Sequence, residues 1–351
     1  MRPVSASPLG AFLTLTTTLG GCDDPTEAHD DDYAPTDEKG DIFGGVDDRI
    51  ERHELELIDP RYELARSYAA LFNGGLARSS FGGWLVTGGN LQRRKNLCNG
   101  EAFAKQPAGA DCSGTLVGPD LVLTAGHCIP NEEGLSLSSP KVQSACNSMK
   151  VAFDYAYDVE GDDPSRLADE DVFQCKKVLA REFDRAPTSL FPPWLGPWLD
   201  YAVIKLDRPV PGRYPVTLQD GGGIGLHRTV TQIGHPSGLP QKLVDGSVTQ
   251  EAQCRNFHHD GDVFGGNSGG GVFDPLTGKI VGVVIRRPDI DEYVWDASRG
   301  CKVTSVCGDN INCFWAPLTL ANGIPFILSR LSNEVKNQLD IAEVGGPSKC
   351  R

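Results

Sequence analysis

The stretch that decides the fold is Cys112-Ser-Gly-Thr-Leu-Val-Gly-Pro-Asp-Leu-Val-Leu-Thr-Ala-Gly-His127-Cys128. Leu121–Thr124 has the apolar, β-branched composition of a strand, and small residues follow it directly. Ala125 and Gly126 allow the backbone to turn tightly, so we expect the imidazole of His127 to leave the core and face a cleft. A disulfide between Cys112 and Cys128 would close this segment, which stabilises a fold by about 3 kcal/mol in the chain-entropy model.

Two later segments carry side chains that complement this histidine. Asp200 opens the apolar run 201–206. Burial at a strand end would hold its carboxylate against an imidazole N–H and fix the tautomer, although the residue could instead only cap the strand. Ser268 lies in the glycine-rich turn Phe264-Gly-Gly-Asn-Ser-Gly-Gly-Gly-Val-Phe273. A serine becomes a good nucleophile when a neighbouring base takes its proton, and the N–H groups of Gly266 and Ser268 could then face the developing oxyanion.

The rest of the chain from residue 42 onward favours strands. Short β-rich runs separated by Gly, Pro and Asp predict an all-β sandwich or barrel; they are residues 114–117, 121–124, 201–206, 229–233 and 279–285. The glycine-rich stretch 221–225 lacks the spacing of a dinucleotide-binding motif and predicts a loop. One helix is predicted near the C-terminus, because Ile327, Leu331, Val335 and Leu339 recur every fourth residue after Pro325.

Composition excludes several classes of function. The 351-residue chain has a formal net charge of −14, which disfavours nucleic-acid binding because phosphates repel acidic surfaces. The chain contains no run of 18 or more apolar residues, so no membrane-spanning helix is expected. Eleven cysteines indicate an oxidising compartment.

The first 41 residues have the pattern of an export signal followed by a tether. Arg2 precedes a moderately apolar core at 9–19, and Leu19-Gly-Gly-Cys22 resembles the processing site of bacterial lipoproteins. This resemblance implies a signal peptide at 1–21 and a lipidated Cys22; an ordinary cleaved signal is the alternative. Residues 23–41 hold nine acidic residues against Lys39, so 22–41 is predicted to be an extended acidic tether.

The histidine and serine segments resemble those of trypsin-like serine peptidases, and the order His127, Asp200, Ser268 is that of chymotrypsin-like enzymes. The resemblance implies two six-stranded antiparallel β-barrels, about 42–209 and about 210–345, the second with the C-terminal helix. It also implies a serine endopeptidase that forms an acyl-enzyme on Ser268 and acts on protein or peptide substrates as a monomer, without cofactor or metal.

Two alternatives are weighed against this interpretation. Gly266-Asn-Ser-Gly-Gly270 also fits the nucleophile elbow of α/β-hydrolases, but that elbow needs a following helix and a later histidine. Three glycines follow Ser268 instead, and His127 lies upstream. The other alternative is an inactive, peptidase-like binding module on the cell surface, which would carry the same motifs.

Residues 42–49, 233–240 and the serine turn look like bacterial trypsin-like peptidases related to glutamyl endopeptidases. In trypsin-type zymogens a freed amine pairs with an aspartate before the serine; Asn267 stands there and is uncharged, so that switch is not expected. The resemblance leaves specificity open. Asp262, six residues before Ser268, would favour Lys or Arg substrates, whereas Arg286 and Arg287 would favour acidic ones. Three positions depart from the family pattern: Phe264 and Val284 stand roughly where glutamyl-specific members have a Thr and a His in the pocket, and Ile285 stands near the place of the family's usual serine beside the buried acid.

Without Cys22 and the pair Cys112–Cys128, eight cysteines remain, and about 105 connectivities are possible. They are Cys98, Cys146, Cys175, Cys254, Cys301, Cys307, Cys313 and Cys350. Three of them, Cys301, Cys307 and Cys313, are close enough for local pairing. No histidine lies near these three to suggest a zinc site. The pair His258-His259 is predicted to lie at the surface.

Overall fold

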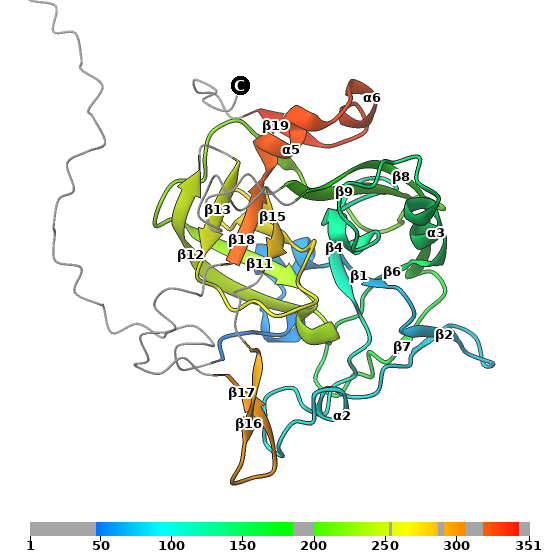
Figure 1. Ribbon diagram of the computed structural model, residues 1–351, viewed down its shortest axis with the longest axis vertical. Helices are drawn as coiled ribbons and strands as arrows, with labels where there is room; N and C mark the ends of the chain where they lie inside the picture. The colour runs from blue at the N-terminus through cyan, green and yellow to red at the C-terminus, as the bar shows by residue number, and fades with distance from the viewer. Residues whose placement is uncertain (1–46, 185–198, 253–254, 287–290, 306–318, 344–351) are drawn as a thin grey trace, which may run out of the picture. The chain divides into compact units, whose positions relative to one another are not determined.

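The computed structural model describes residues 47–184, 199–252, 255–286, 291–305 and 319–343 (Figure 1). All of them belong to the second of two compact units, Lys39–Arg351. The predicted signal peptide, Cys22 and the whole acidic tether lie outside the described residues, as do Arg287, Cys254, Cys307, Cys313 and Cys350. None of the helices in the described ranges is long and apolar enough to cross a membrane.

A closed six-stranded barrel forms in the first half of the chain. Its strands pair in the order β1-β4-β5-β9-β8-β6, and all neighbours are antiparallel. The bounds are β1 Tyr68–Phe72, β4 Cys112–Gly118, β5 Leu121–Thr124, β6 Lys150–Phe153, β8 Val172–Asp184 and β9 Leu199–Leu206. The predicted runs 114–117, 121–124 and 201–206 therefore all lie in strands of this barrel.

The second half forms another closed ring. The ring runs β14-β11-β12-β13-β18-β15 and closes through the β14–β15 pair, again with antiparallel neighbours. Its strands are β11 Thr229–Gly234, β12 Lys242–Ala252, β13 Asn256–His259, β14 Gly271–Asp274, β15 Lys279–Arg286 and β18 Thr319–Gly323. Two short strands, β10 Leu218–Asp220 and β19 Ile341–Glu343, extend the sheet in parallel beyond β15. The predicted all-β, two-barrel fold is confirmed.

Apolar side chains fill each barrel and the junction between them. Leu116, Val122 and Ile204 lie in the core of the first barrel, and Val230, Phe257 and Val284 in that of the second. A third cluster joins both barrels, since Tyr68 and Tyr201 pack with Phe273 and other residues of the second. Full burial of one such side chain contributes about 1.5–3 kcal/mol. This shared core holds the two barrels against one another.

The C-terminal helix is present but is divided in two. Helix α5 spans Ile324–Arg330 and α6 spans Asn333–Lys336, with Leu331 in an extended conformation between them. Ser332 caps α6, because its hydroxyl accepts a hydrogen bond from the N–H of Val335 at 3.4 Å. A serine at this position starts a new helix instead of continuing the old one. The predicted apolar face is nevertheless buried, at Ile327, Leu331 and Val335.

The remaining helices and sheets are short. The helices are η1 Arg52–Glu54, α1 Pro60–Ala65, α2 Leu91–Lys95, η2 Gly126–Cys128, α3 Pro140–Ser148 and η3 Pro236–Gly238. Strands β2 Leu76–Arg78, β3 Trp84–Val86 and β7 Arg166–Leu167 form a small sheet, and β16 Tyr293–Asp296 pairs with β17 Cys301–Thr304. The stretch 221–225 forms no strand or helix, as predicted.

Three disulfides join the described residues. The predicted pair Cys112–Cys128 is present, and Cys146 is bonded to Cys175. Cys98 is bonded to Cys301, which lies 203 residues later, so Cys301 does not use the local pairing that its spacing left open. This bond attaches the β16–β17 hairpin to the segment that follows α2.

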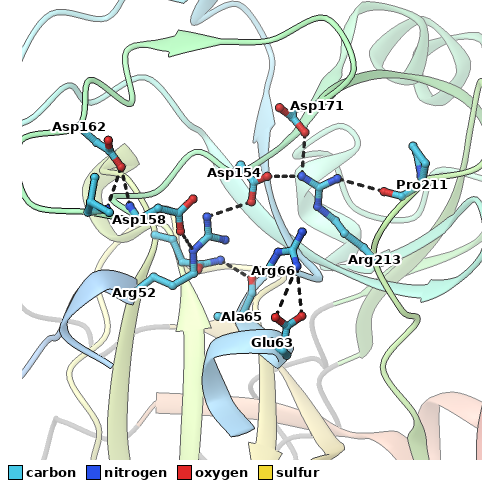
Figure 2. Close-up of polar contacts among 12 residues, drawn as sticks. Arg52, Glu63, Ala65, Arg66, Asp154, Asp158, Asp162, Asp171, Pro211 and Arg213 are labelled. Atoms are coloured by element: carbon cyan, nitrogen blue, oxygen red, sulfur yellow. Dashed lines mark hydrogen bonds and ion pairs between the residues drawn. The ribbon is translucent and has the colours of Figure 1, made fainter. Parts of the chain in front are cut away.

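Buried charges anchor the start of the described chain to the first barrel (Figure 2). The fully buried Arg52 donates to Asp158 at 2.5 Å and to Asp154 at 2.9 Å, and Arg213 donates to Asp154 and to Asp171. Removing one partner of such a pair is costly because it leaves an uncompensated charge. The segment near Arg52 is therefore part of the folded body.

The predicted surface position of His258 and His259 is wrong. Both lie on β13, and His259 is only 1% exposed. Burial lowers the pKa of His259 to about 3, so that its ring is neutral near pH 7. All four residues of β13 are buried, so both faces of this strand are covered and neither histidine reaches the surface.

Candidate active site

His127 and Asp200 lie in direct contact. The Nδ1 atom of His127 is 2.7 Å from Oδ2 of Asp200, and the backbone N–H of His127 donates to Oδ1 at 2.8 Å. The second bond fixes the carboxylate independently of the ring, so that its other oxygen is aimed at Nδ1. Because a carboxylate only accepts, the proton lies on Nδ1, and Nε2 is free to accept one.

The turn that carries His127 requires the glycine before it. A Cβ atom on Gly126 would overlap the carbonyl oxygen of Glu182 and reach that of Tyr201. Those two residues are register partners on β8 and β9, and Asp200 lies on β9 next to Tyr201. The local sequence therefore lets η2 approach the strand pair closely enough for the His127–Asp200 contact to form.

Asp200 is also held from the second barrel. Its side chain is buried, and its backbone N–H donates to Oδ1 of Asn322 at 2.9 Å. The amide of Asn322, on β18, in turn donates to Oδ1 of Asn256 on β13 at 2.6 Å. The aspartate at the start of β9 is thus positioned by groups from both barrels.

The serine turn is attached to the first barrel through Ser113. The N–H of Ser113 donates to the carbonyl of Ser268 at 2.8 Å, and its hydroxyl donates to the carbonyl of Gly266 at 2.7 Å. The sulfur of Cys128, the residue after His127, lies 3.9 Å from the same Ser268 carbonyl. These contacts bring the backbone of Ser268 to the histidine segment.

The backbone of the serine turn depends on its glycines. Gly266 has φ +98° and Gly269 φ +84°, in the region that favours glycine. A Cβ on Gly266 would overlap the carbonyl of His235, and one on Gly269 would overlap Thr124. Among the described residues, the N–H groups of Gly266 and Ser268 donate no hydrogen bond to the protein. Both predicted oxyanion donors therefore remain available for a ligand.

The expected specificity residues lie in different surroundings. Asp262 is 2% exposed and its carboxyl contacts that of Asp48, with Arg49 nearby. Burial raises the pKa of Asp48, while the hydrogen bond with Asp262 opposes that shift. Arg286 ends β15 and is half-buried. The structure thus pairs the predicted pocket acid with another acid of the same protein.

The three positions that depart from the family pattern are all packed. Phe264 is buried beneath the guanidinium of Arg49, which lies 4.2 Å from the ring centroid, and its ring lies 5.8 Å from that of Tyr293. Val284 lies in the core of the second barrel, and Ile285 in that of the first. Each replaces a polar group expected from the resemblance with apolar contact.

One cluster has the donor atoms of a metal site. The ligand atoms of Cys112, His127 and Cys128 lie within 4.8 Å of one another. The two cysteines are joined as a disulfide, however, and thiolate is the form that binds metal. This set therefore does not fit a metal ion.

Sequence reasoning missed three residues that build the site. Ser113 lies within the quoted histidine segment, so its proximity to the serine turn could have been suspected. Asn322 and Arg181 lie far from every motif in the sequence, and Arg181 donates to the carbonyl of Gly126 at 2.9 Å. No local pattern distinguishes them from ordinary polar residues of a strand.

Comparison with known proteins gives one family match and several solved structures of low similarity. Residues 112–283 match the family model described as "Trypsin-like peptidase domain". A search of curated proteins found no match. Among solved structures, a Glu endopeptidase in complex with MPD is 17% identical, with 84% of this chain and 100% of that chain covered and a TM-score of 0.44.

Two further structures are similar at the same level. The VesB protease of Vibrio cholerae is 16% identical, with coverage of 75% and 62% and a TM-score of 0.40. The HtrA-type protease AlgW, solved with a decapeptide, is 14% identical, with coverage of 81% and 69% and a TM-score of 0.43. The two closed barrels match a chymotrypsin-like fold, and the family match over residues 112–283 agrees with it.

Proposed function

Starting from this trypsin-like peptidase domain, we propose that the chain is a serine endopeptidase that hydrolyses peptide bonds through an acyl-enzyme on Ser268. The observation that carries the proposal is the contact of 2.7 Å between His127 Nδ1 and Asp200 Oδ2. That contact leaves Nε2 as the basic atom, and the histidine segment is adjacent to the Ser268 backbone. These contacts support His127 as the base, Asp200 as its orienting acid and Ser268 as the nucleophile.

The reaction follows from these roles. Nε2 of His127 takes the hydroxyl proton as Ser268 Oγ attacks the substrate carbonyl, and Asp200 stabilises the imidazolium that forms. Collapse of the tetrahedral intermediate breaks the C–N bond, and His127 returns the proton to the leaving amine. Water then repeats the sequence, which releases the acid and restores Ser268.

The N–H groups of Gly266 and Ser268 are proposed to bind the oxyanion. Neither donates to the described protein, and the positive φ of Gly266 sets the turn between them. One such donor contributes about 3 kcal/mol to the lowering of the barrier. Ser113 supports this arrangement because it holds the carbonyls of the same two residues.

Labelling with a fluorophosphonate tests the activity. The folded protein is expected to react at Ser268 and to cleave an unfolded protein substrate, and Ser268→Ala is expected to do neither. Absence of labelling in a sample with a cooperative unfolding transition would reject the enzyme. That result would favour the inactive surface binding module.

Specificity is proposed to depend on Asp262 or on Arg286 and Arg287. Cleavage of a peptide library after Lys or Arg, lost in Asp262→Asn, would assign the pocket acid. Cleavage after Asp or Glu, lost in Arg286→Gln or Arg287→Gln, would assign the arginines. Asp48→Asn is the control for Asp262→Asn, because the two side chains are hydrogen-bonded to each other and the control leaves Asp262 in place.

The protein is also proposed to be exported and anchored to the bacterial envelope by a lipid on Cys22, as a monomer. Three disulfides in the described residues support an oxidising compartment. Metabolic labelling with a palmitate analogue is expected to mark the wild-type chain but not Cys22→Ala. Unmodified chain in the medium would indicate an ordinary signal peptide instead.

A further inference from the structure

Arg181 is a buried arginine beside the candidate site. It lies on β8, one strand away from Asp200, and its register partner is Ala202 on β9. Its exposed fraction is 6%. Arginine is rarely buried to this extent without a partner that accounts for its charge and its five donors.

The guanidinium of Arg181 binds backbone carbonyls only. Nε donates to Gly126 at 2.9 Å, Nη1 to Leu135 at 3.2 Å, and Nη2 to Pro130 and to Glu132 at 2.8 Å each. Gly126 immediately precedes His127, and the other three carbonyls belong to the loop that follows η2. One side chain therefore fixes the backbone on both sides of the histidine.

The charge of Arg181 is not neutralised by an ion pair among the described residues. Burial lowers the pKa of this guanidinium, and the negative charges of Asp200 and Glu132 oppose that shift. Glu132 is half-exposed and pairs with Lys141 at 2.6 Å, so Asp200 is the buried acid that faces this charge. A buried positive charge acts on its neighbours with less screening than a surface one.

Phe183 connects the same region to the imidazole. Its ring centroid lies 5.8 Å from that of His127 and 5.7 Å from the carbon of the Arg181 guanidinium. The register of β8 and β9 pairs Phe183 with Asp200. The groups that face the His127–Asp200 pair from this side are thus one aromatic ring and one cation.

We propose that Arg181 is a positioning residue for the His127–Asp200 pair. It holds the backbone around His127 through the Gly126 carbonyl, and its positive charge interacts with the negative charge of Asp200 on the neighbouring strand. This inference rests on the proposed peptidase activity. It assigns to Arg181 two separable effects, one of geometry and one of charge.

Two variants separate these effects. Arg181→Gln removes the charge, whereas Arg181→Lys keeps the charge but loses the planar fork. Rates are normalised to sites titrated with the fluorophosphonate, so unfolded molecules do not count. Arg208 provides the control, because it donates to three carbonyls and stacks on Phe173, away from the site. Unlike Arg181, it is half-exposed and pairs with Asp207.

Arg181→Gln is expected to lower kcat about tenfold with little change in KM, because a displaced base slows the chemical step. It is also expected to move the acidic limb of the kcat/KM profile to higher pH by about half a unit, since loss of a nearby cation stabilises the protonated imidazole. Arg181→Lys is expected to leave that limb in place while kcat still falls.

Three outcomes decide the matter. If the wild type neither labels nor cleaves, the proposed function itself fails. If the wild type is active and Arg181→Gln changes only the melting temperature, as Arg208→Gln is expected to do, the positioning role is overturned. If both Arg181 variants shift the pH profile equally, the charge effect is overturned. If Arg181→Gln does not fold, the geometric effect is tested with lysine variants instead: it requires a lower kcat for Arg181→Lys than for Arg208→Lys, and equal kcat values overturn it.

Discussion

The backbone N–H of Asp200 donates a hydrogen bond of 2.9 Å to Oδ1 of Asn322, across the junction of the two barrels. Asp200 begins β9 in the first barrel, and Asn322 lies on β18 in the second and is fully buried. The proposed acid is therefore held in place by a residue that lies 122 positions later. Ser113 forms the reciprocal tie, from the first barrel to the serine turn of the second. Both contacts make the site depend on how the barrels meet.

Asn322→Ala should weaken both the fold and the reaction. It leaves the buried N–H of Asp200 without its acceptor, which costs about 1–3 kcal/mol. We expect a lower melting temperature and slower fluorophosphonate labelling per folded molecule. Asn90→Ala is the control, because Asn90 also accepts a backbone N–H, that of Arg93, but at the start of α2. Equal labelling rates in the two variants would contradict a role for Asn322 in placing Asp200.

Gly266→Ala should remove activity while the protein stays folded. The residue has φ +98°, and an added Cβ would overlap the carbonyl of His235, so that the peptide must move from its position at the oxyanion site. Loss of one oxyanion donor lowers kcat by about 10²–10³-fold. Gly278→Ala provides the comparison, since it has φ +66° with nothing within 4 Å of the added atom. Similar rates in both variants would argue against an oxyanion role for Gly266.

Removal of the Cys112–Cys128 disulfide should affect stability and catalysis together. The double replacement of both cysteines by serine is expected to cost about 3 kcal/mol. It should also slow hydrolysis per folded molecule, because the bond lies between His127 and the Ser268 carbonyl. Replacement of Cys146 and Cys175, which are bonded elsewhere in the same barrel, should lower stability alone. Chemical denaturation and rates at saturating substrate measure the two effects.

Buried His259 should make the fold sensitive to acid. Its pKa is about 3 when folded and near 6.5 when unfolded, so the unfolded state binds the extra proton between these values. Its contribution to stability is therefore lost as pH falls from about 6.5 towards 3, by at most about 1.4 kcal/mol per pH unit. Denaturation of His259→Asn should show a shallower slope over that range. Asparagine can still accept from the N–H of Gly261, as Nδ1 does now.

The exposed His227 gives the control for that measurement. His227→Asn keeps a side chain that tolerates the positive φ of 58° and should retain the wild-type slope. Parallel slopes for wild type and His259→Asn would show that another group governs the acid side of the stability curve.

The strands around the motifs and the Cys112–Cys128 bond could be predicted from the sequence, because each is a short-range pattern: an apolar run, a small-residue turn, a pair of cysteines that flank one loop. The two-barrel fold was implied by the resemblance that these motifs carry. Such patterns restrict the local backbone directly, so they can be recognised without knowledge of what packs against them. The identity of His127, Asp200 and Ser268 as site residues comes from the same patterns and stays a prediction.

Only the tertiary structure decided which residues surround those motifs. The roles of Asn322 and Arg181 and the partner of Cys98 are set by contacts between distant segments. His259 is buried because both faces of β13 are covered. The break after α5 depends likewise on Ser332, which caps a new helix within an unbroken apolar pattern. Barrel closure determines which side chains meet at the junction, and that information is distributed over the whole chain instead of residing in any one segment.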